Sequence, residues 1–76
     1  MPNDGTVVPL ATGTVRWFDS AKGHGFVTCD AGGPDCFLHQ SSLGVEDLRL
    51  IEEGTRLVFE LVEGLGGPLI VSARRL

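Results

Sequence analysis

Turn-forming residues interrupt this chain so often that short strands are favoured over long helices. Eleven glycines and four prolines are spread over 76 residues. Both residue types are unfavourable inside helices and favourable in tight turns, so their abundance predicts short strands joined by turns. A chain of this length forms one domain with a small core and modest stability.

The segments between the turns predict five strands, because they are rich in β-branched and aromatic residues. Residues 40–54 are different: Val45, Leu48 and Ile51 recur at about helical spacing, which predicts a short helical piece in an irregular connection. Five short strands suit a small closed all-β barrel, since closure removes the exposed edges that promote aggregation. The predicted strands are residues 13–19, 24–29, 36–39, 56–63 and 69–74.

Residues 1–11 are expected to form a partly ordered N-terminal extension, with the folded domain spanning residues 12–76. The N-terminus has neither the basic start nor the apolar stretch of a secretory signal. No apolar run approaches the roughly 20 residues that cross a bilayer. Two cysteines, Cys29 and Cys36, are too few for a secreted disulfide scaffold and are expected to be free thiols. These features predict a cytoplasmic protein that does not contact a membrane.

The second and third predicted strands form an antiparallel hairpin around a loop dense in turn residues. Side chains alternate across a strand, so the hairpin has two faces of different chemistry. One face is aliphatic and sulfur-bearing, and we expect it to pack in the core with Val15, Leu57, Phe59 and Leu61. That inner face carries Val27, Cys29, Cys36 and Leu38, and the opposite face carries His24, Phe26, Thr28, Phe37 and His39.

The aromatic face is predicted to lie near solvent, where neighbouring exposed rings indicate a binding surface. The alternative is that Phe26 and Phe37 are core residues, as single phenylalanines usually are. Their alternation in phase with two histidines favours the exposed arrangement, because histidine fills a closed core poorly. Exposed rings suit unpaired nucleobases, which stack on aromatic side chains, and Arg16 and Lys22 are near enough in sequence to contact phosphates.

The residues from Gly13 to the C-terminus resemble the bacterial cold-shock protein family. The segment Gly13-Thr-Val-Arg-Trp-Phe-Asp-Ser-Ala-Lys-Gly-His-Gly-Phe-Val is similar to the opening of that family, and Asp35-Cys-Phe-Leu-His is similar to its second ribonucleoprotein-type motif. Glu52-Glu-Gly, Phe59-Glu and Gly67-Pro recur at the family's spacing.

This resemblance implies a small five-stranded antiparallel OB-type barrel over residues 12–76 that binds single-stranded DNA or RNA by base stacking. It implies that Trp17, Phe26, Phe37 and His39 face the ligand. Lys22 and Arg16 would supply charge, and Asp35 would accept a hydrogen bond from a base. The family places the residue matching Trp17 at the surface and the one matching Phe18 in the core. Because strict alternation would put Trp17 inward with Val15, the resemblance also implies a bulge in the first strand.

Several residues depart from the family pattern and predict weaker binding than is typical of the family. Aromatic residues are usual where this chain has His24, Gln40 and Leu48, and a basic residue is common at Gly66. Ten acidic residues against six basic ones give a net charge of −4, which is unfavourable for binding phosphates. The alternative function is therefore a cold-shock fold that no longer binds nucleic acid and instead binds a protein partner. The unusual Leu69-Ile-Val segment favours that alternative.

Catalysis, metal binding and cofactors are not predicted. His24, Cys29, Cys36 and His39 match no usual zinc spacing, and the cysteines point inward while the histidines point outward. His39 with Asp35 on an open sheet lacks the pocket that an active site needs. We therefore expect a monomeric binding protein that is not an enzyme and has no cofactor and no metal.

Overall fold

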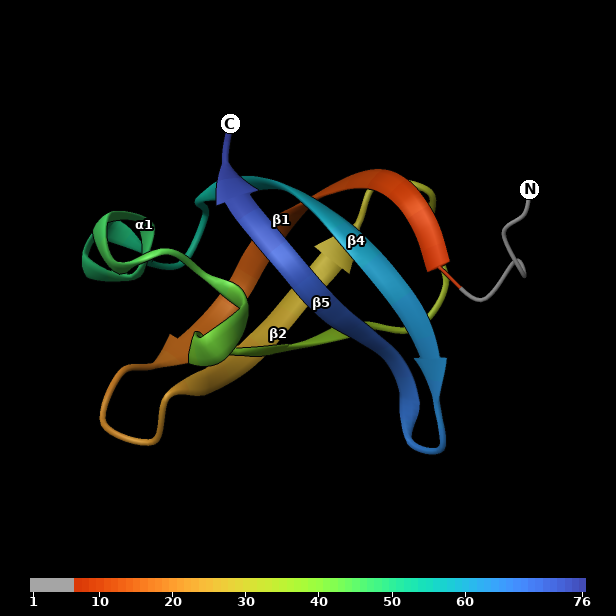
Figure 1. Cartoon of the computed structure of the whole chain (residues 1–76), viewed down its shortest axis with the longest axis horizontal. Helices are drawn as coiled ribbons and strands as arrows, with labels where there is room; N and C mark the ends of the chain where they lie inside the picture. Colours follow the sequence, from red (N-terminus) through yellow and green to blue (C-terminus); the bar gives the residue numbers. More distant parts are fainter. Residues whose placement is uncertain (1–6) are drawn as a thin grey trace.

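Five strands close into a barrel in the computed structural model, which describes residues 7–76 (Figure 1). A single 3₁₀ turn, η1 (Gln40–Ser42), and a short helix, α1 (Val45–Leu50), lie in the connection between the third and fourth strands. This confirms the prediction of a small all-β barrel with one short helical piece. The strands are β1 (Val7–Asp19), β2 (His24–Cys29), β3 (Cys36–His39), β4 (Arg56–Gly64) and β5 (Gly67–Arg75).

The strand order around the barrel is β1-β2-β3-β5-β4, and β4 pairs back onto β1. Four of the neighbouring pairs are antiparallel, whereas β3 and β5 are parallel, with Phe37 opposite Leu69. The family resemblance implies an antiparallel barrel, and only the β3–β5 pair departs from that arrangement. The reason is geometric: strands in a closed ring of five cannot all alternate in direction, so at least one neighbouring pair must run parallel. Figure 1 shows β4 and β5 side by side, with β1 curving behind them.

The first strand begins at Val7, six residues before its predicted start at Gly13. Val7 and Val8 pair with Val62 and Leu61 of β4, so residues 7–11 belong to the sheet. The β-branched valines favour this extended pairing. The register shifts between Val8 and Ala11, around Pro9, which has no N–H to donate to the ladder. Residues 1–6 lie outside the described part of the chain.

The core is mostly aliphatic, with Phe59 and Cys36 among its members, and every strand contributes inward-facing residues to it. Val27, Cys36 and Leu38 of the β2–β3 hairpin point inward, which confirms the predicted inner face. Leu48 and Ile51 pack against the edge of this core, so the short α1 segment covers one side of it. Among residues 7–76, no helix is long and apolar enough to span a membrane. The buried side chains are Val15, Val27, Cys36, Leu38, Leu43, Leu57, Phe59, Ile70 and Ala73.

A charged cluster at the end of β2 ties three parts of the barrel together. The Arg56 guanidinium donates two hydrogen bonds to the Asp30 carboxylate, at 2.8 and 2.7 Å. The Thr12 hydroxyl donates a third to the same carboxylate at 2.6 Å. Because Arg56, and then Thr12, stabilise the ionised carboxylate, the pKa of Asp30 lies well below its usual range. The cluster therefore joins the β2–β3 loop to β1 and β4.

Candidate nucleic-acid interface

A bulge in β1 places Trp17 on the outside of the barrel. Val15 pairs with Val27 and Trp17 pairs with Phe26, so Arg16 is the extra residue between two registered pairs. The inserted residue reverses the alternation, and Trp17 is 41% exposed while Phe18 packs against the core. This irregularity is the one that the family resemblance implies and that simple alternation does not predict.

Four aromatic rings form a contiguous cluster on this outer face. The ring centroids of Trp17 and Phe26 are 5.7 Å apart, and those of Phe26 and Phe37 are also 5.7 Å apart. His24 closes the circuit, at 6.0 Å from Trp17 and 5.8 Å from Phe37. We call Trp17, His24, Phe26 and Phe37 the ring cluster.

The ring cluster lies outside the barrel core, as predicted, but its phenylalanines are half-buried rather than fully exposed. Phe26 and Phe37 are direct cross-strand partners and meet edge to face, with an interplanar angle of 71°. Neighbouring rings in this arrangement cover each other's edges and fix one another's orientation. The cluster is thus a preformed surface whose side chains already contact each other.

A shallow pocket of about 330 Å³ extends the ring cluster toward the β4–β5 turn. Phe26 and Phe37 form one wall, and Leu65, Pro68 and Leu69 form the other. Residues of the β4–β5 turn were not predicted to join the site, because the parallel pairing that places Leu69 beside Phe37 cannot be read from local sequence patterns. The only sequence feature that points to these residues is the departure from the family pattern at Gly66 and at Leu69.

His39 lies opposite His24 in the strand register, but it takes no part in the ring contacts among residues 7–76. The Ser41 backbone N–H donates to His39 Nδ1 at 3.1 Å, so the imidazole caps η1. His39 therefore stands at the border of the ring cluster with one ring nitrogen engaged by its own chain.

The charged residues beside the ring cluster largely neutralise one another. The Arg16 guanidinium donates to the Asp35 carboxylate at 2.7 Å. Lys22 is exposed in the β1–β2 turn, where Asp19 accepts the backbone N–H groups of Ala21 and Lys22 at 3.0 Å. Among the residues that the structure describes, Lys22 forms no ion pair. The net positive charge available beside the rings is thus small.

The histidines and cysteines of the hairpin are separated as the face pattern predicts. Cys36 is buried and Cys29 is half-buried on the inner side, whereas the His24 and His39 rings lie on the outer side. Within residues 7–76, no three His, Cys, Asp or Glu side chains are grouped so that they could hold a metal ion.

Comparison with known proteins adds an independent observation. The family model described as 'Cold-shock' DNA-binding domain matches residues 11–72. Cold shock protein ScoF of Streptomyces coelicolor is 44% identical over 59 residues, which cover 78% of this chain and 88% of that protein. Cold shock-like protein CspA of Stigmatella aurantiaca is 47% identical over 58 residues, covering 76% and 85% respectively.

A solved structure with the same architecture has a very different sequence. A copper(II)-bound variant of CusF from Escherichia coli superposes with a TM-score of 0.64, covering 100% of this chain and 99% of that chain. Only 16% of the residues are identical, so this likeness concerns the fold alone. It supports the assignment of an OB-type barrel, while the family match over residues 11–72 and the cold-shock relatives concern the sequence itself. The chain belongs to the cold-shock domain family.

Proposed function

We propose that this protein binds single-stranded DNA or RNA by stacking unpaired bases on the ring cluster. The single observation that carries the proposal is the circuit of ring contacts on the outer face of the β2–β3 hairpin. Its relatives are cold shock proteins, and the description of the matching family model is a DNA-binding domain. The proposed contact residues are Arg16, Trp17, Lys22, His24, Phe26, Asp35, Phe37 and His39.

Stacking supplies most of the binding free energy in this proposal. Each base stacked on an aromatic side chain contributes about 1–3 kcal/mol, with little preference for base identity. Trp17 and the phenylalanines offer separate platforms, and the pocket beside Phe37 can accept a further base against Leu69. His24 stacks less strongly than the aromatic residue usual in the family. We therefore expect this protein to bind single strands more weakly than typical family members do.

Electrostatic attraction contributes less than in most nucleic-acid-binding proteins. Asp35 already neutralises Arg16, and Lys22 is the cation nearest the rings without an ion pair among the described residues. The net charge of −4 opposes the approach of a polyanion. The proposed binding therefore depends on base stacking and involves few phosphate contacts. The proposal also places the protein in the cytoplasm and assigns it no catalytic step.

Titration of Trp17 fluorescence with hexathymidylate at low salt tests the proposal. Stacking should quench the single tryptophan. Phe37→Ala removes one platform of the cluster, so we expect affinity to fall by roughly 5- to 150-fold, the loss of about 1–3 kcal/mol. Leu50→Ala, an exposed apolar side chain on α1, is the matched control and should bind like the parent. Equal affinity of parent and Phe37→Ala would contradict the proposal.

A second candidate function is binding to a protein partner, and one observation favours it. Leu65, Leu69 and Val71 are exposed apolar side chains of the β4–β5 turn and β5, where the chain departs from the family pattern. Such side chains suit a protein surface as well as a nucleobase. In this case hexathymidylate would leave Trp17 fluorescence unchanged even at low salt.

A further inference from the structure

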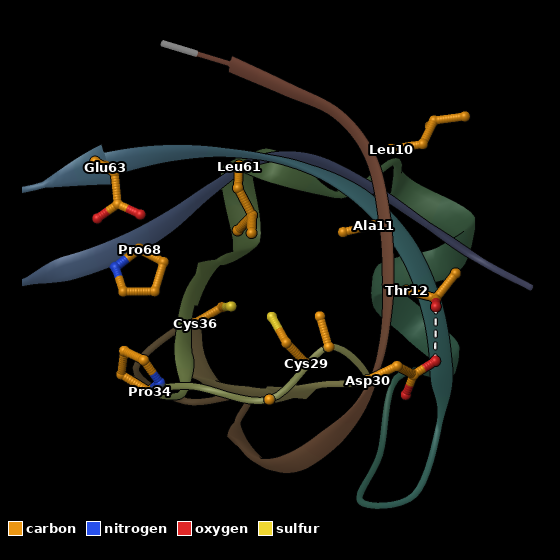
Figure 2. Close-up of a pocket in the computed structure, with 12 residues that line it drawn as sticks. Leu10, Ala11, Thr12, Cys29, Asp30, Pro34, Cys36, Leu61, Glu63 and Pro68 are labelled. Carbon is orange, nitrogen blue, oxygen red and sulfur yellow. Dashed lines mark hydrogen bonds between the residues drawn. The ribbon is translucent and has the colours of Figure 1, made fainter. Parts of the chain in front are cut away.

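The open end of the barrel holds a second pocket, separate from the ring cluster. It has a volume of about 480 Å³, and its lining is largely apolar. Figure 2 shows Leu61, Ala11 and Pro68 around it, with the side chains of Cys29 and Cys36 projecting into it. Neither cysteine has a role in the proposed function.

The two thiols differ in exposure and lie next to each other. Both cysteines line the pocket, but Cys36 is fully buried whereas Cys29 is half-buried. Burial raises the pKa of the Cys36 thiol to about 12, and the neighbouring Cys29 thiol adds to the rise. In Figure 2 the two sulfur atoms point toward one another. A small molecule that enters the pocket therefore reaches the half-buried Cys29 more readily than the buried Cys36.

The strand register explains this arrangement. Val27 pairs with Cys36, so Cys29, two residues further along β2, is a diagonal neighbour of Cys36 on the same inner face. Diagonal partners have Cα atoms about 7–8 Å apart, slightly beyond the usual disulfide range of about 4.4–6.8 Å. A bond between them requires a small shift of the backbone at the ends of these two strands.

The loop between the cysteines can supply that shift. Both residues lie at a strand end, Cys29 at the end of β2 and Cys36 at the start of β3. Gly32 and Gly33 in the connecting loop are exposed and have φ angles of 91° and 87°. A Cβ at either glycine would have no neighbour within 4 Å, so nothing packs against the tip of the loop. The loop can therefore adjust at its tip, between the ion pairs of Asp30 with Arg56 and of Asp35 with Arg16 that hold its two ends.

We propose that Cys29 and Cys36 form a redox pair in which a hydroperoxide oxidises Cys29 and Cys36 then closes a disulfide across the end of the barrel. This inference is independent of nucleic-acid binding. It rests on the shared pocket, the different exposure of the two cysteines and the unpacked Gly32–Gly33 tip of the loop that joins them.

The chemistry balances with a hydroperoxide as the oxidant. The Cys29 thiolate sulfur attacks one peroxide oxygen, the O–O bond breaks, and the other oxygen leaves and takes a proton to give water (an alcohol when the peroxide is organic). Cys29 is now a sulfenic acid, oxidised by two electrons, and the peroxide is reduced. The Cys36 sulfur then attacks the Cys29 sulfur, the S–O bond breaks, and the hydroxyl leaves as water with the proton of the Cys36 thiol.

Intact-protein mass measurement after hydrogen peroxide treatment and alkylation tests the proposal on the full chain. The untreated protein, alkylated under denaturing conditions, should carry two adducts. The treated protein should carry none, and its mass should be lower than that of the reduced chain by the two thiol hydrogens. Dithiothreitol should restore both adducts.

Single variants separate the two roles. Cys36→Ala leaves Cys29 without a resolving thiol, so a dimedone adduct should form on Cys29 after peroxide. Cys29→Ala should leave the buried Cys36 alkylatable at peroxide doses that convert the parent completely. Parent-like Trp17 fluorescence in both variants verifies that they are folded.

Three results would overturn the proposal. They are retention of both thiols in the treated parent, disulfide-linked dimers in place of the intramolecular bond, and overoxidation of Cys29 while Cys36 remains alkylatable.

Discussion

Arg16 and Asp35 form an ion pair at the edge of the ring cluster. This pair determines how much positive charge the site offers to a phosphate. The bulge in β1 inserts Arg16, and its guanidinium reaches the Asp35 carboxylate at 2.7 Å. The Arg16 side chain remains 64% exposed, so the pair is accessible to water and weak in free energy. A phosphate that approaches Arg16 must compete with this carboxylate.

Asp35→Asn should release Arg16 for contact with phosphate. For single strands, each neutralised phosphate steepens the plot of log K against log salt by about 0.7. We therefore expect the slope for hexathymidylate to become steeper by about that amount in the variant. Fluorescence titrations over a series of salt concentrations measure it. An unchanged slope would show that Arg16 does not contact the strand in either protein.

Gly25 is needed for packing between β1 and β2. A Cβ at this position would clash with the Trp17 carbonyl oxygen and lie 2.8 Å from the Phe18 Cα. These are backbone atoms that cannot move aside individually, so Gly25→Ala should lower the free energy of unfolding by about 1–3 kcal/mol or more. Urea denaturation measures the loss. Gly66→Ala, where a Cβ has no neighbour within 4 Å, is the matched control and should be close to neutral. Similar stability of the two variants would contradict this explanation.

The elements of the barrel differ in how far local sequence determines them. The bounds of β2 and β3 agree with the prediction, because turn-rich segments enclose two short runs of alternating residues. The early start of β1 depends on pairing with β4, which is remote in sequence. The bulge at Arg16 likewise has no local signal, and only the family resemblance indicated it. Local patterns therefore predicted the strands of the central hairpin but not the irregularities that turn Trp17 outward.

The cluster of Asp30, Arg56 and Thr12 makes the attachment of the β2–β3 loop depend on pH. Arg56, with help from Thr12, lowers the pKa of Asp30 in the folded protein relative to its unfolded value of about 3.9. A group with a depressed folded pKa stabilises the fold above its unfolded pKa, and this contribution is lost as the pH falls toward the folded value. The cluster should thus stabilise the protein at neutral pH and progressively less below about pH 4.

Asp30→Asn should reveal that dependence. At pH 7 the variant should unfold at a lower urea concentration than the parent, because Arg56 loses its charged partner. The difference should shrink as the pH is lowered below about 4, because Asp30 of the unfolded parent is protonated there while the folded parent keeps the charge until the pH nears its depressed pKa. Urea midpoints measured at several pH values provide the comparison. A difference that is independent of pH would mean that the charge of Asp30 is not what holds the loop.

At the scale of the whole molecule, an acidic protein carries a mostly uncharged aromatic surface. The net charge is −4, and three arginines are paired with aspartates: Arg16, Arg56 and Arg75. The composition predicts weak attraction to phosphates, but it does not show which charges pair. The exposed aromatic side of the hairpin was predictable from alternation, whereas the pocket against Leu69 required the parallel β3–β5 pair.

The parent protein should consequently show a shallow salt dependence. With one or two phosphates neutralised, the slope of log K against log salt for a single strand should lie between about −0.7 and −1.4. Titration of Trp17 fluorescence with hexathymidylate at increasing salt measures it. A slope steeper than about −3 would require four or more phosphate contacts, which this charge distribution does not provide.

The most direct test of the central claim is a map of backbone amide shifts in the ¹⁵N-labelled protein as hexathymidylate is added. If unpaired bases stack on the ring cluster, the largest shifts should be at Trp17, His24, Phe26 and Phe37. Smaller shifts should extend to Leu69, and the α1 residues should remain unchanged. Saturating shifts confined to other surfaces, or none at low salt, would contradict the claim that this outer face binds nucleic acid.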